Sequence, residues 1–217
     1  MDLVDALRTT GSVRAFMHEP VDDATVVRLL DIARFAPSGG NRQGWRVALV
    51  KAVAARRQLA ALMQPVWDEY LAQSASGRTP FNVIDAPDIV GVSPHRPNPL
   101  LDTIDAVPVV LVVAADLRCL AMMDKDLDRA ALTGGASVYP FCWNVLLAAR
   151  ALGLGGVMTT FLSRAERAAA PLLGLPEHHA IASVLFLGHP VHQPTKLSRR
   201  AVAEFAHLDR FDGPPLG

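Results

Sequence analysis

The stretch that decides the fold reads A-P-S-G-G-N-R-Q-G-W-R and occupies residues 36–46. Pro, Ser, Gly and Asn are dense in its first half, which predicts a tight turn between two regular elements. Upstream, Asp22 or Asp23 can cap a helix of helically spaced apolar residues, and this helix is expected to end before Pro37. Downstream, residues 45–50 read as a strand. The stretch is therefore expected to join a helix to a strand.

The rest of the chain supplies further strands and helices without strict alternation. Nearly continuous apolar runs at 107–115 and 180–187 predict buried strands, and residues 157–159 predict a short one. Helices are expected at 52–72, at 126–152 with a kink at Pro140, and up to residue 173 after a capping box of Ser163 and Glu166. This mixture predicts an α+β fold, with helices flanking a sheet, in preference to a Rossmann fold.

Composition excludes several classes of function. The 217 residues carry 21 Lys and Arg against 21 Asp and Glu, so no clustered basic surface and no nucleic-acid binding are expected. Because 51% of the residues are hydrophobic, the chain is expected to bury surface in a homo-oligomer. A membrane span is not expected, because the uncharged run at 130–149 contains Thr133, Pro140 and Asn144. The first residues show no signal-peptide pattern, so a cytoplasmic location is expected.

Common catalytic and metal-binding motifs are absent from the sequence. Gly153, Gly155 and Gly156 follow a predicted helix, and the dinucleotide-binding pattern that they begin fails at Met158. There is no P-loop, nucleophile elbow or H-E-x-x-H motif. The seven His and two Cys lack metal-ligand spacing, so neither a metal site nor a disulfide framework is expected.

Four short pieces of sequence carry a further signal. They are S-V-R-A-F at 12–16, the stretch at 36–46, N-V-L-L-A-A-R-A-L-G-L-G at 144–155, and a last piece that runs from L-G-L-P at 173–176 through L-G-H-P at 187–190 to S-R-R at 198–200. In this order and spacing they resemble the FMN-dependent nitroreductase family. The resemblance implies a nitroreductase-like fold with a central, mostly antiparallel sheet. It also implies an intertwined homodimer with FMN at the subunit interface and swapped C-terminal tails.

The resemblance covers nearly the whole chain, so residues 1–217 are expected to form one FMN-binding domain. Within it, X-Pro pairs repeatedly interrupt residues 74–105, which are expected to form a lid or insert on the substrate side. Phe81, Asn82 and His95 are its candidate contacts. Residues 189–217 are expected to form the C-terminal arm.

The first family motif usually reads R-R-S-x-R and holds the flavin phosphate or pyrimidine edge. Here Thr10 and Gly11 stand where the two arginines are expected, and Arg8 is a candidate substitute. Guanidinium and hydroxyl donors suit a phosphate dianion. By resemblance, the cofactor-binding residues of this group are Ser12, Arg14, Lys196 and Arg199.

Two further segments are expected at the flavin ring. The family loop along the isoalloxazine ring, where small residues allow close approach of the backbone, corresponds to Pro37, Ser38, Gly39, Asn41 and Gln43. Thr159 and Thr160 match the segment that meets flavin N5 and O4, where an N–H or hydroxyl donor stabilises the reduced form. No side chain is expected to be catalytic itself, because flavin N5 carries the chemistry.

The resemblance implies an oxidoreductase with a ping-pong mechanism. NADPH or NADH reduces FMN, and the reduced flavin then reduces a nitroaromatic, a quinone or a similar conjugated acceptor. Dehalogenase-like and flavin-destructase-like enzymes are alternatives, although residues 77–105 contain no Lys, Glu, Tyr or Trp with which a deiodinase grips an amino acid. The missing arginines at Thr10 and Gly11 leave a catalytically silent flavin-storage or binding protein as a third alternative.

Overall fold

A computed structural model describes residues 1–85 and 95–217 of the chain. Its centre is a four-stranded sheet with the strand order β1-β2-β4-β3, in which every neighbouring pair is antiparallel. The strands are β1 (Trp45–Leu49), β2 (Val109–Asp116), β3 (Gly155–Thr159) and β4 (His179–Gly188). The four predicted strands and the α+β class with an antiparallel sheet are confirmed.

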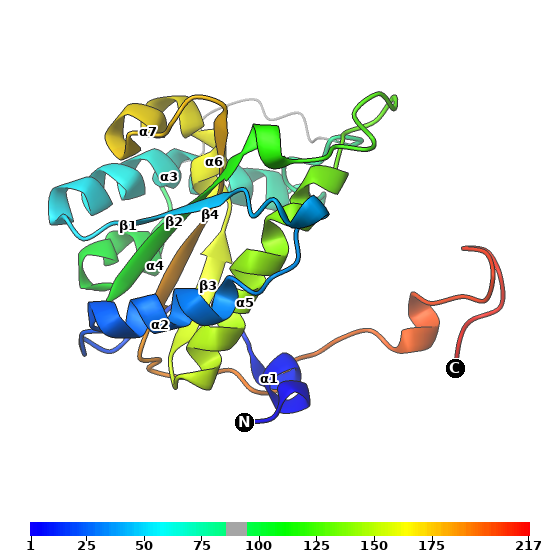
Figure 1. The fold of residues 1–217 in the computed structure, drawn as a ribbon, viewed down its shortest axis with the longest axis horizontal. Coiled ribbons are helices and arrows are strands. Elements are labelled where there is room, and N and C mark those ends of the chain that lie inside the picture. The colour runs from blue at the N-terminus through cyan, green and yellow to red at the C-terminus, as the bar shows by residue number, and fades with distance from the viewer. Residues whose placement is uncertain (86–94) are drawn as a thin grey trace.

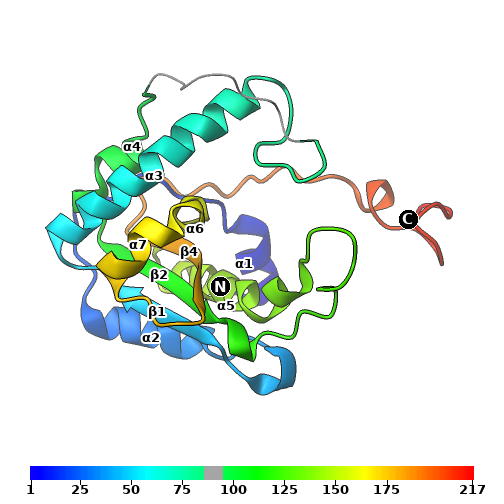
Figure 2. The same cartoon turned by 90° about the horizontal axis from the view of Figure 1, so that it is seen from above.

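Helices cover both faces of the sheet (Figures 1 and 2). One face carries α2 (Asp23–Ala33) and α5 (Tyr139–Ala151). The other face carries α3 (Val53–Ser74), α4 (Pro99–Asp102), α6 (Phe161–Arg164) and α7 (Glu166–Leu173). The short helix α1 (Leu3–Thr9) lies beside α5.

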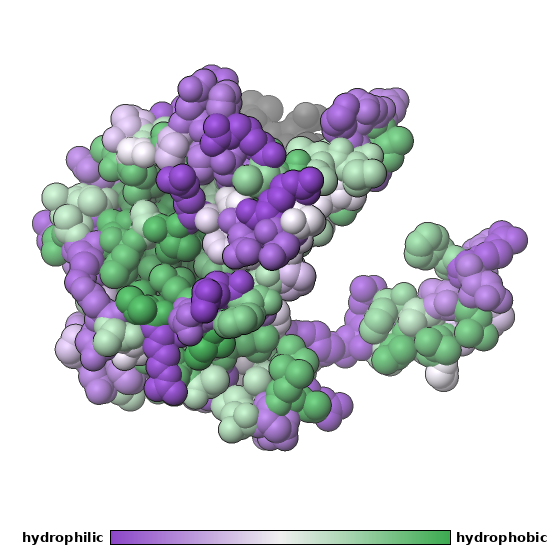
Figure 3. Space-filling model, in the orientation of Figure 1, coloured by the Kyte–Doolittle hydropathy of each residue, from purple (hydrophilic) through white to green (hydrophobic). Residues whose placement is uncertain are grey.

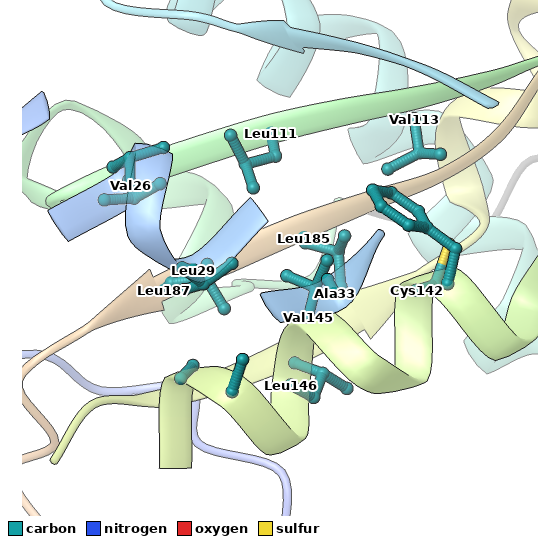
Figure 4. Packing of buried hydrophobic residues seen from close by; sticks show 14 of the residues in the cluster. Val26, Leu29, Ala33, Leu111, Val113, Cys142, Val145, Leu146, Leu185 and Leu187 are labelled. Carbon is teal, nitrogen blue, oxygen red and sulfur yellow. The ribbon is translucent and has the colours of Figure 1, made fainter. Parts of the chain in front are cut away.

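Alternation along β2 and β4 divides the buried side chains into two cores, because successive strand residues point to opposite faces. Figure 4 shows the first core, where α2 and α5 pack on Leu111, Val113, Leu185 and Leu187. The intervening residues Val110, Val112, Val184 and Phe186 face α3, α4 and α6 in the second core. Both faces of the central strands are therefore dry, as their continuous apolar sequence predicts.

The turn that opens the sheet forms as predicted. Asp22 caps α2, and its carboxylate accepts a hydrogen bond from the Thr25 N–H at 2.7 Å. The helix ends at Ala33, before Pro37, and β1 begins at Trp45.

The predicted helix at 126–152 is wrong in its first half. Helix α5 begins only at Tyr139, and Pro140 occupies its first turn, where the missing proline N–H would have no intrahelical partner. Pro140 therefore starts the helix and does not kink it. The preceding residues form turns around the buried Asp124 carboxylate, which accepts hydrogen bonds from the Leu132 N–H at 2.9 Å and the Arg129 guanidinium at 2.7 Å.

The predicted capping box of Ser163 and Glu166 is also wrong. The segment forms two short helices, α6 and α7, and Ser163 lies inside the first. The Glu166 carboxylate accepts a hydrogen bond from the Ile181 N–H at 2.6 Å, so it ties α7 to β4.

Residues 189–217 leave the body as an arm that projects away from it (Figures 1 and 2). Figure 3 shows hydrophobic residues on this arm, and its large exposed apolar side chains are Val191, Val202, Phe205, Leu208, Phe211 and Leu216. The root of the arm packs against Gly11, where an added Cβ would lie 2.8 Å from both the Cβ and the carbonyl oxygen of Pro194. Close packing of the arm thus accounts for a glycine at position 11.

The predicted lid at 74–105 is described only at its two ends. Residues 86–94, with the expected breaks before Pro87 and Pro94, lie outside the described residues. On the far side, Asn98 caps α4 by accepting hydrogen bonds from the Leu100 and Leu101 N–H groups at 3.2 and 3.4 Å. Across residues 1–85 and 95–217, none of the helices combines the length and apolar character that a membrane crossing needs.

Candidate functional site

The segment that contains the first motif runs alongside β3. The Val13 N–H donates to the Gly156 carbonyl oxygen at 2.9 Å, and Ser12 forms a parallel bridge with Gly156. Further along, the Met17 N–H donates to the His189 carbonyl oxygen at 2.8 Å, just beyond β4. These backbone contacts hold residues 12–17 at the β3 edge of the sheet, where Arg14 lies beside the end of that strand.

A cavity of about 320 Å³ opens at this place. Arg14 comes from the N-terminal segment, and Thr159 and Thr160 come from the end of β3 and the residue after it. Three aromatic side chains form another wall, namely Trp67 and Tyr70 of α3 and Phe161 of α6. The remaining lining residues are Asn98, Leu100, Leu101, Val157, Met158 and Phe186. The structure thus brings three of the predicted site residues, Arg14, Thr159 and Thr160, to one cavity.

The polar groups of this cavity include two hydrogen-bond donors that have no partner among the described residues. Arg14 is exposed and has no ion pair within the part of the chain that the structure describes. The Trp67 Nε1–H is buried and has no acceptor there. A buried N–H without a partner costs about 1–3 kcal/mol, so it favours a ligand that brings an acceptor. A planar ring with several acceptors, such as the isoalloxazine of FMN, fits this donor set and the aromatic wall.

The aromatic wall is itself ordered by stacking. The Trp67 and Tyr70 rings are parallel within 8°, with centroids 6.0 Å apart. Phe161 meets Tyr70 edge-on at 5.8 Å. Sequence reasoning did not identify these residues as part of a site. The signal that could have found them is the i, i+3 spacing of Trp67 and Tyr70, which places both rings on one helix face.

Lys196 and Arg199 lie on the arm, close to its contact with Gly11, where Pro194 and Leu197 pack. The Gln193 side chain donates to the Gly11 carbonyl oxygen at 3.2 Å, which fixes the root of the arm next to Ser12. Lys196 and Arg199 are exposed, and neither forms an ion pair with a residue in 1–85 or 95–217. The first motif and the tail motif are therefore joined at the root of the arm, with their cations available to an anion.

The loop at 37–43 is held by its own hydrogen bonds. Gly40, Asn41 and Gln43 have positive φ angles of 60°, 53° and 50°. The Ser38 hydroxyl accepts from the Gln43 N–H at 3.0 Å, and the Gln43 side chain donates to Asn41 Oδ1 at 3.1 Å. The Gly39 N–H donates to the Ser137 hydroxyl at 3.0 Å, which anchors the loop ahead of α5. The Gln43 side chain thus holds the loop in this conformation.

This loop and the cavity lie at opposite edges of the sheet. The loop leads into β1, whereas Arg14, Thr159 and Thr160 gather at β3, and the strand order β1-β2-β4-β3 places two strands between them. Three inter-strand steps amount to about 14 Å. None of Pro37, Ser38, Gly39, Asn41 and Gln43 lines the cavity among the described residues. One chain therefore does not bring the two predicted halves of the flavin site together.

The described residues hold no group of three or more His, Cys, Asp or Glu side chains placed to bind a metal ion. The two cysteines are free, and Cys142 is buried in α5 with its sulfur 3.3 Å from the Ser183 hydroxyl. Burial raises the pKa of the Cys142 thiol.

Known proteins resemble this chain over most of its length. A model of the nitroreductase family matches residues 7–189. The chain is 27% identical over 194 residues to an NADH dehydrogenase of Thermus thermophilus, covering 89% of each protein. It is 29% identical over 198 residues to a 5,6-dimethylbenzimidazole synthase of Rhodospirillum rubrum, covering 87% of this chain and 82% of that one.

Solved structures share the fold at lower identity. The NADPH:FMN oxidoreductase of Vibrio harveyi, complexed with NAD⁺, superposes with a TM-score of 0.68 at 21% identity, covering 96% of this chain and 77% of the other. A nitroreductase-like protein of Desulfovibrio desulfuricans, in complex with FMN, gives a TM-score of 0.69 at 21% identity, covering 97% and 98% of the two chains.

Proposed function

This chain belongs to the nitroreductase family, and we propose that it is an FMN-dependent oxidoreductase that uses NADH or NADPH to reduce a nitroaromatic, a quinone or a similar conjugated acceptor. The observation that carries the proposal is the cavity at the β3 edge, where Arg14, Thr159 and Thr160 meet an aromatic wall. Bound FMN supplies the transfer of electrons between the two substrates. The side chains of this protein bind the cofactor, orient it and complement its charge.

The cations of the N-terminal segment and the arm are assigned to the acceptor-rich parts of FMN. Ser12, Arg14, Lys196 and Arg199 supply hydroxyl, guanidinium and ammonium donors for the phosphate and the pyrimidine edge. Charge-assisted hydrogen bonds of this kind are shorter and stronger than neutral ones. The Thr159 and Thr160 hydroxyls are assigned to the ring near N5 and O4, where donors favour the reduced, more negative flavin.

We assign the functional unit to a homodimer. The loop at 37–43 is too far from the cavity of its own chain, so Pro37, Ser38, Gly39 and Asn41 are assigned to the flavin of the partner subunit. Exposed apolar side chains on the arm support this arrangement. So does a groove of about 370 Å³ between α2 and β1, whose lining is mostly apolar: Val27, Leu30, Trp45, Val47 and Phe141, with the charged Asp31 and Arg34. Figure 3 shows hydrophobic residues gathered on this face of the body.

Residues 1–217 then form one FMN-binding domain, with residues 189–217 as the arm that reaches across the partner. The C-terminal end of the segment at 74–105 lines the cavity through Asn98, Leu100 and Leu101, which supports a role on the substrate side.

The proposal is tested with purified protein reconstituted with excess FMN and freed of unbound flavin. We expect one FMN per chain and oxidation of NADH or NADPH that depends on an added quinone or nitroaromatic. The double variant Thr159→Val with Thr160→Val loses two hydroxyl donors of the cavity. It should keep the fold and oxidise NADH or NADPH more slowly than the wild type. Protein that stays colourless after reconstitution would refute the proposal.

The relationship to a 5,6-dimethylbenzimidazole synthase supports a second candidate, an enzyme that consumes its own FMN. Incubation of the FMN-loaded protein with a reductant in air separates the two activities. An oxidoreductase returns intact FMN, measured by chromatography, whereas a flavin destructase loses it and forms a benzimidazole product. FMN that remains bound and is never reduced by NADH or NADPH would identify a flavin-storage protein.

A further inference from the structure

A network of four side chains fastens residues 77–85 to the body beside the cavity. We call Glu69, Gln73, Phe81 and Arg164 the clasp. The Arg164 guanidinium donates from Nη2 to Glu69 Oε1 at 2.8 Å and from Nε to Glu69 Oε2 at 3.2 Å. Its plane lies over the Phe81 ring, with Cζ 4.5 Å from the ring centroid. The clasp thus joins α3, α6 and the segment that follows α3.

Gln73 closes the network from the buried side. Its amide nitrogen donates to Glu69 Oε1 at 3.1 Å, and its amide oxygen accepts from the Phe81 N–H. Gln73 is 6% exposed, so both of these hydrogen bonds are largely shielded from water. A buried amide with both ends engaged holds Phe81 in one place.

Phe81 is held in an unfavourable backbone conformation. Its φ angle is +55°, in the left-handed region, which a bulky aromatic residue rarely adopts. Such a conformation persists only where surrounding contacts determine it, and it is concentrated at ligand clamps and functional sites. The Gln73 hydrogen bond and the Arg164 guanidinium are the contacts that hold Phe81 there.

None of the four clasp residues lines the cavity itself, but two of them are near residues that do. Glu69 precedes Tyr70, which lines the cavity, and Arg164 lies one helical turn after Phe161, which also lines it. Tyr70 and Phe161 contact each other at 5.8 Å. Movement of Arg164 or Glu69 would therefore be transmitted to the aromatic wall.

The fastened segment presents a rim that is apolar and electrically balanced. At its tip, Val83 and Ile84 are 74% and 87% exposed. Its charged groups cancel in pairs, since Arg78 lies 3.0 Å from Asp85 and Arg164 is bound to Glu69. Such a rim favours an uncharged planar molecule over a carboxylated one, because residues 77–85 offer no unpaired cation to a carboxylate.

We propose that Arg164 is a positioning residue that, with Glu69 and Gln73, holds residues 77–85 at the rim and so sets the affinity for an uncharged, planar conjugated acceptor such as a quinone. This inference rests on the proposed function for the identity of the reaction. The state of the clasp itself is measurable without any flavin.

Two measurements on Arg164→Ala test the inference. In the flavin-free protein, trypsin should cut after Arg78 at least five times faster than in the wild type, because cleavage follows local opening of the segment. In the FMN-loaded enzyme, KM for an uncharged quinone should rise about fivefold to tenfold, whereas kcat and the Kd for FMN should stay within twofold. Arg164→Lys, which keeps the charge and loses the bidentate contact, should give an intermediate result in both measurements.

Arg167→Ala, on the exposed side of α7, is the matched control and should behave as the wild type in both measurements. Unchanged cleavage after Arg78 in Arg164→Ala and Arg164→Lys would refute the clasp. Faster cleavage with an unchanged KM for the quinone, or equal effects on KM and on the Kd for FMN, would refute its role in acceptor binding. Wild-type protein that binds no FMN would refute the proposed function and the acceptor role, while the cleavage result would still decide on the clasp.

Discussion

The backbone N–H of Val13 lies 2.9 Å from the carbonyl oxygen of Gly156 and donates a hydrogen bond to it. This contact joins the first motif to the start of β3, although the two are far apart in the sequence. It carries Arg14, the next residue, to the cavity that Thr159 and Thr160 also line. Val13 is fully buried against Gly155, where an added Cβ would lie 2.6 Å from Val13 Cγ2. The hydrogen bond between Val13 and Gly156 therefore depends on a glycine, Gly155, at the start of β3.

Replacing the site cations should weaken FMN binding. In the proposed site, Arg14→Ala and Arg199→Ala each remove a charge-assisted hydrogen bond to FMN, worth about 1.5–3 kcal/mol, so the Kd for FMN should rise roughly tenfold or more in each. The Kd is measured by adding the flavin-free protein to FMN and following the change in flavin fluorescence. Arg167→Ala serves as the control. Unchanged Kd values in both variants would contradict the assignment of Arg14 and Arg199 to the phosphate and pyrimidine edge of FMN.

The buried Arg56 should be a major source of stability. Its guanidinium donates to the carbonyl oxygens of Val50 at 2.8 Å, Val107 at 2.6 Å and Pro108 at 3.3 Å, and so ties α3 to the ends of β1 and β2. Burial lowers the pKa of this guanidinium. Arg56→Met leaves these carbonyl groups without a donor and should lower the free energy of unfolding by about 3 kcal/mol.

The neighbouring Arg57 provides the matched comparison for that experiment. It forms an ion pair with Asp105 at 2.6 Å, but its side chain is 71% exposed. Arg57→Met should therefore change the free energy of unfolding by less than about 1 kcal/mol. The free energy of unfolding of both variants is measured by urea denaturation. Equal losses for Arg56→Met and Arg57→Met would contradict the role given to Arg56.

Asp124 should make the stability of the protein depend on acid pH. Hydrogen bonds from the Thr133 hydroxyl, the Leu132 N–H and Arg129 hold the pKa of its carboxyl below the usual range. The stabilisation is therefore fully present above the unfolded pKa of about 4 and is lost as the pH falls through the lower folded pKa. Asp124→Asn should have a lower Tm than the wild type at pH 7, and the difference should shrink toward pH 2. A constant difference in Tm between pH 7 and pH 2 would contradict this account.

The arm should control assembly. Phe205 and Phe211 are exposed in the single chain, and burying each side chain against a partner contributes about 1.5–3 kcal/mol. Phe205→Ser with Phe211→Ser should weaken the dimer at least tenfold, as measured by analytical ultracentrifugation over a range of concentrations. Weaker FMN retention should accompany dissociation, because the loop at 37–43 would no longer reach a flavin. A wild-type protein that binds FMN as a stable monomer would contradict the interface.

The sequence correctly predicted the elements whose structure is determined by neighbouring residues in the chain. Asp22 caps α2 as expected, and the apolar runs of β2 and β4 form central strands because both of their faces are covered. The predictions failed where a hydrogen bond with a residue distant in the sequence determines the local structure. Glu166 resembles a capping residue in sequence, but it accepts a hydrogen bond from Ile181 of β4. Likewise, the chain before α5 is not helical as predicted, because Arg129, Leu132 and Thr133 donate hydrogen bonds to the buried Asp124 carboxylate.

The candidate site shows the same division. Arg14, Thr159 and Thr160 were predicted from motifs, and the fold brings them to one cavity. The aromatic wall of Trp67, Tyr70 and Phe161 was not predicted, because apolar residues on a helix face are ordinary core residues unless the structure places a cavity beside them. The positive φ angle of Phe81 and its contact with Arg164 depend on the packing of α3 against α6, which no local sequence pattern specifies.

We propose that this chain binds FMN and passes electrons from NADH or NADPH to an acceptor through it. An anaerobic absorbance titration of the FMN-loaded protein tests this claim most directly. We predict that stoichiometric NADH or NADPH bleaches the oxidised flavin bands and that a later addition of quinone restores them. Oxidised flavin bands that persist with excess NADH and NADPH, or the absence of any flavin after reconstitution, would contradict the account.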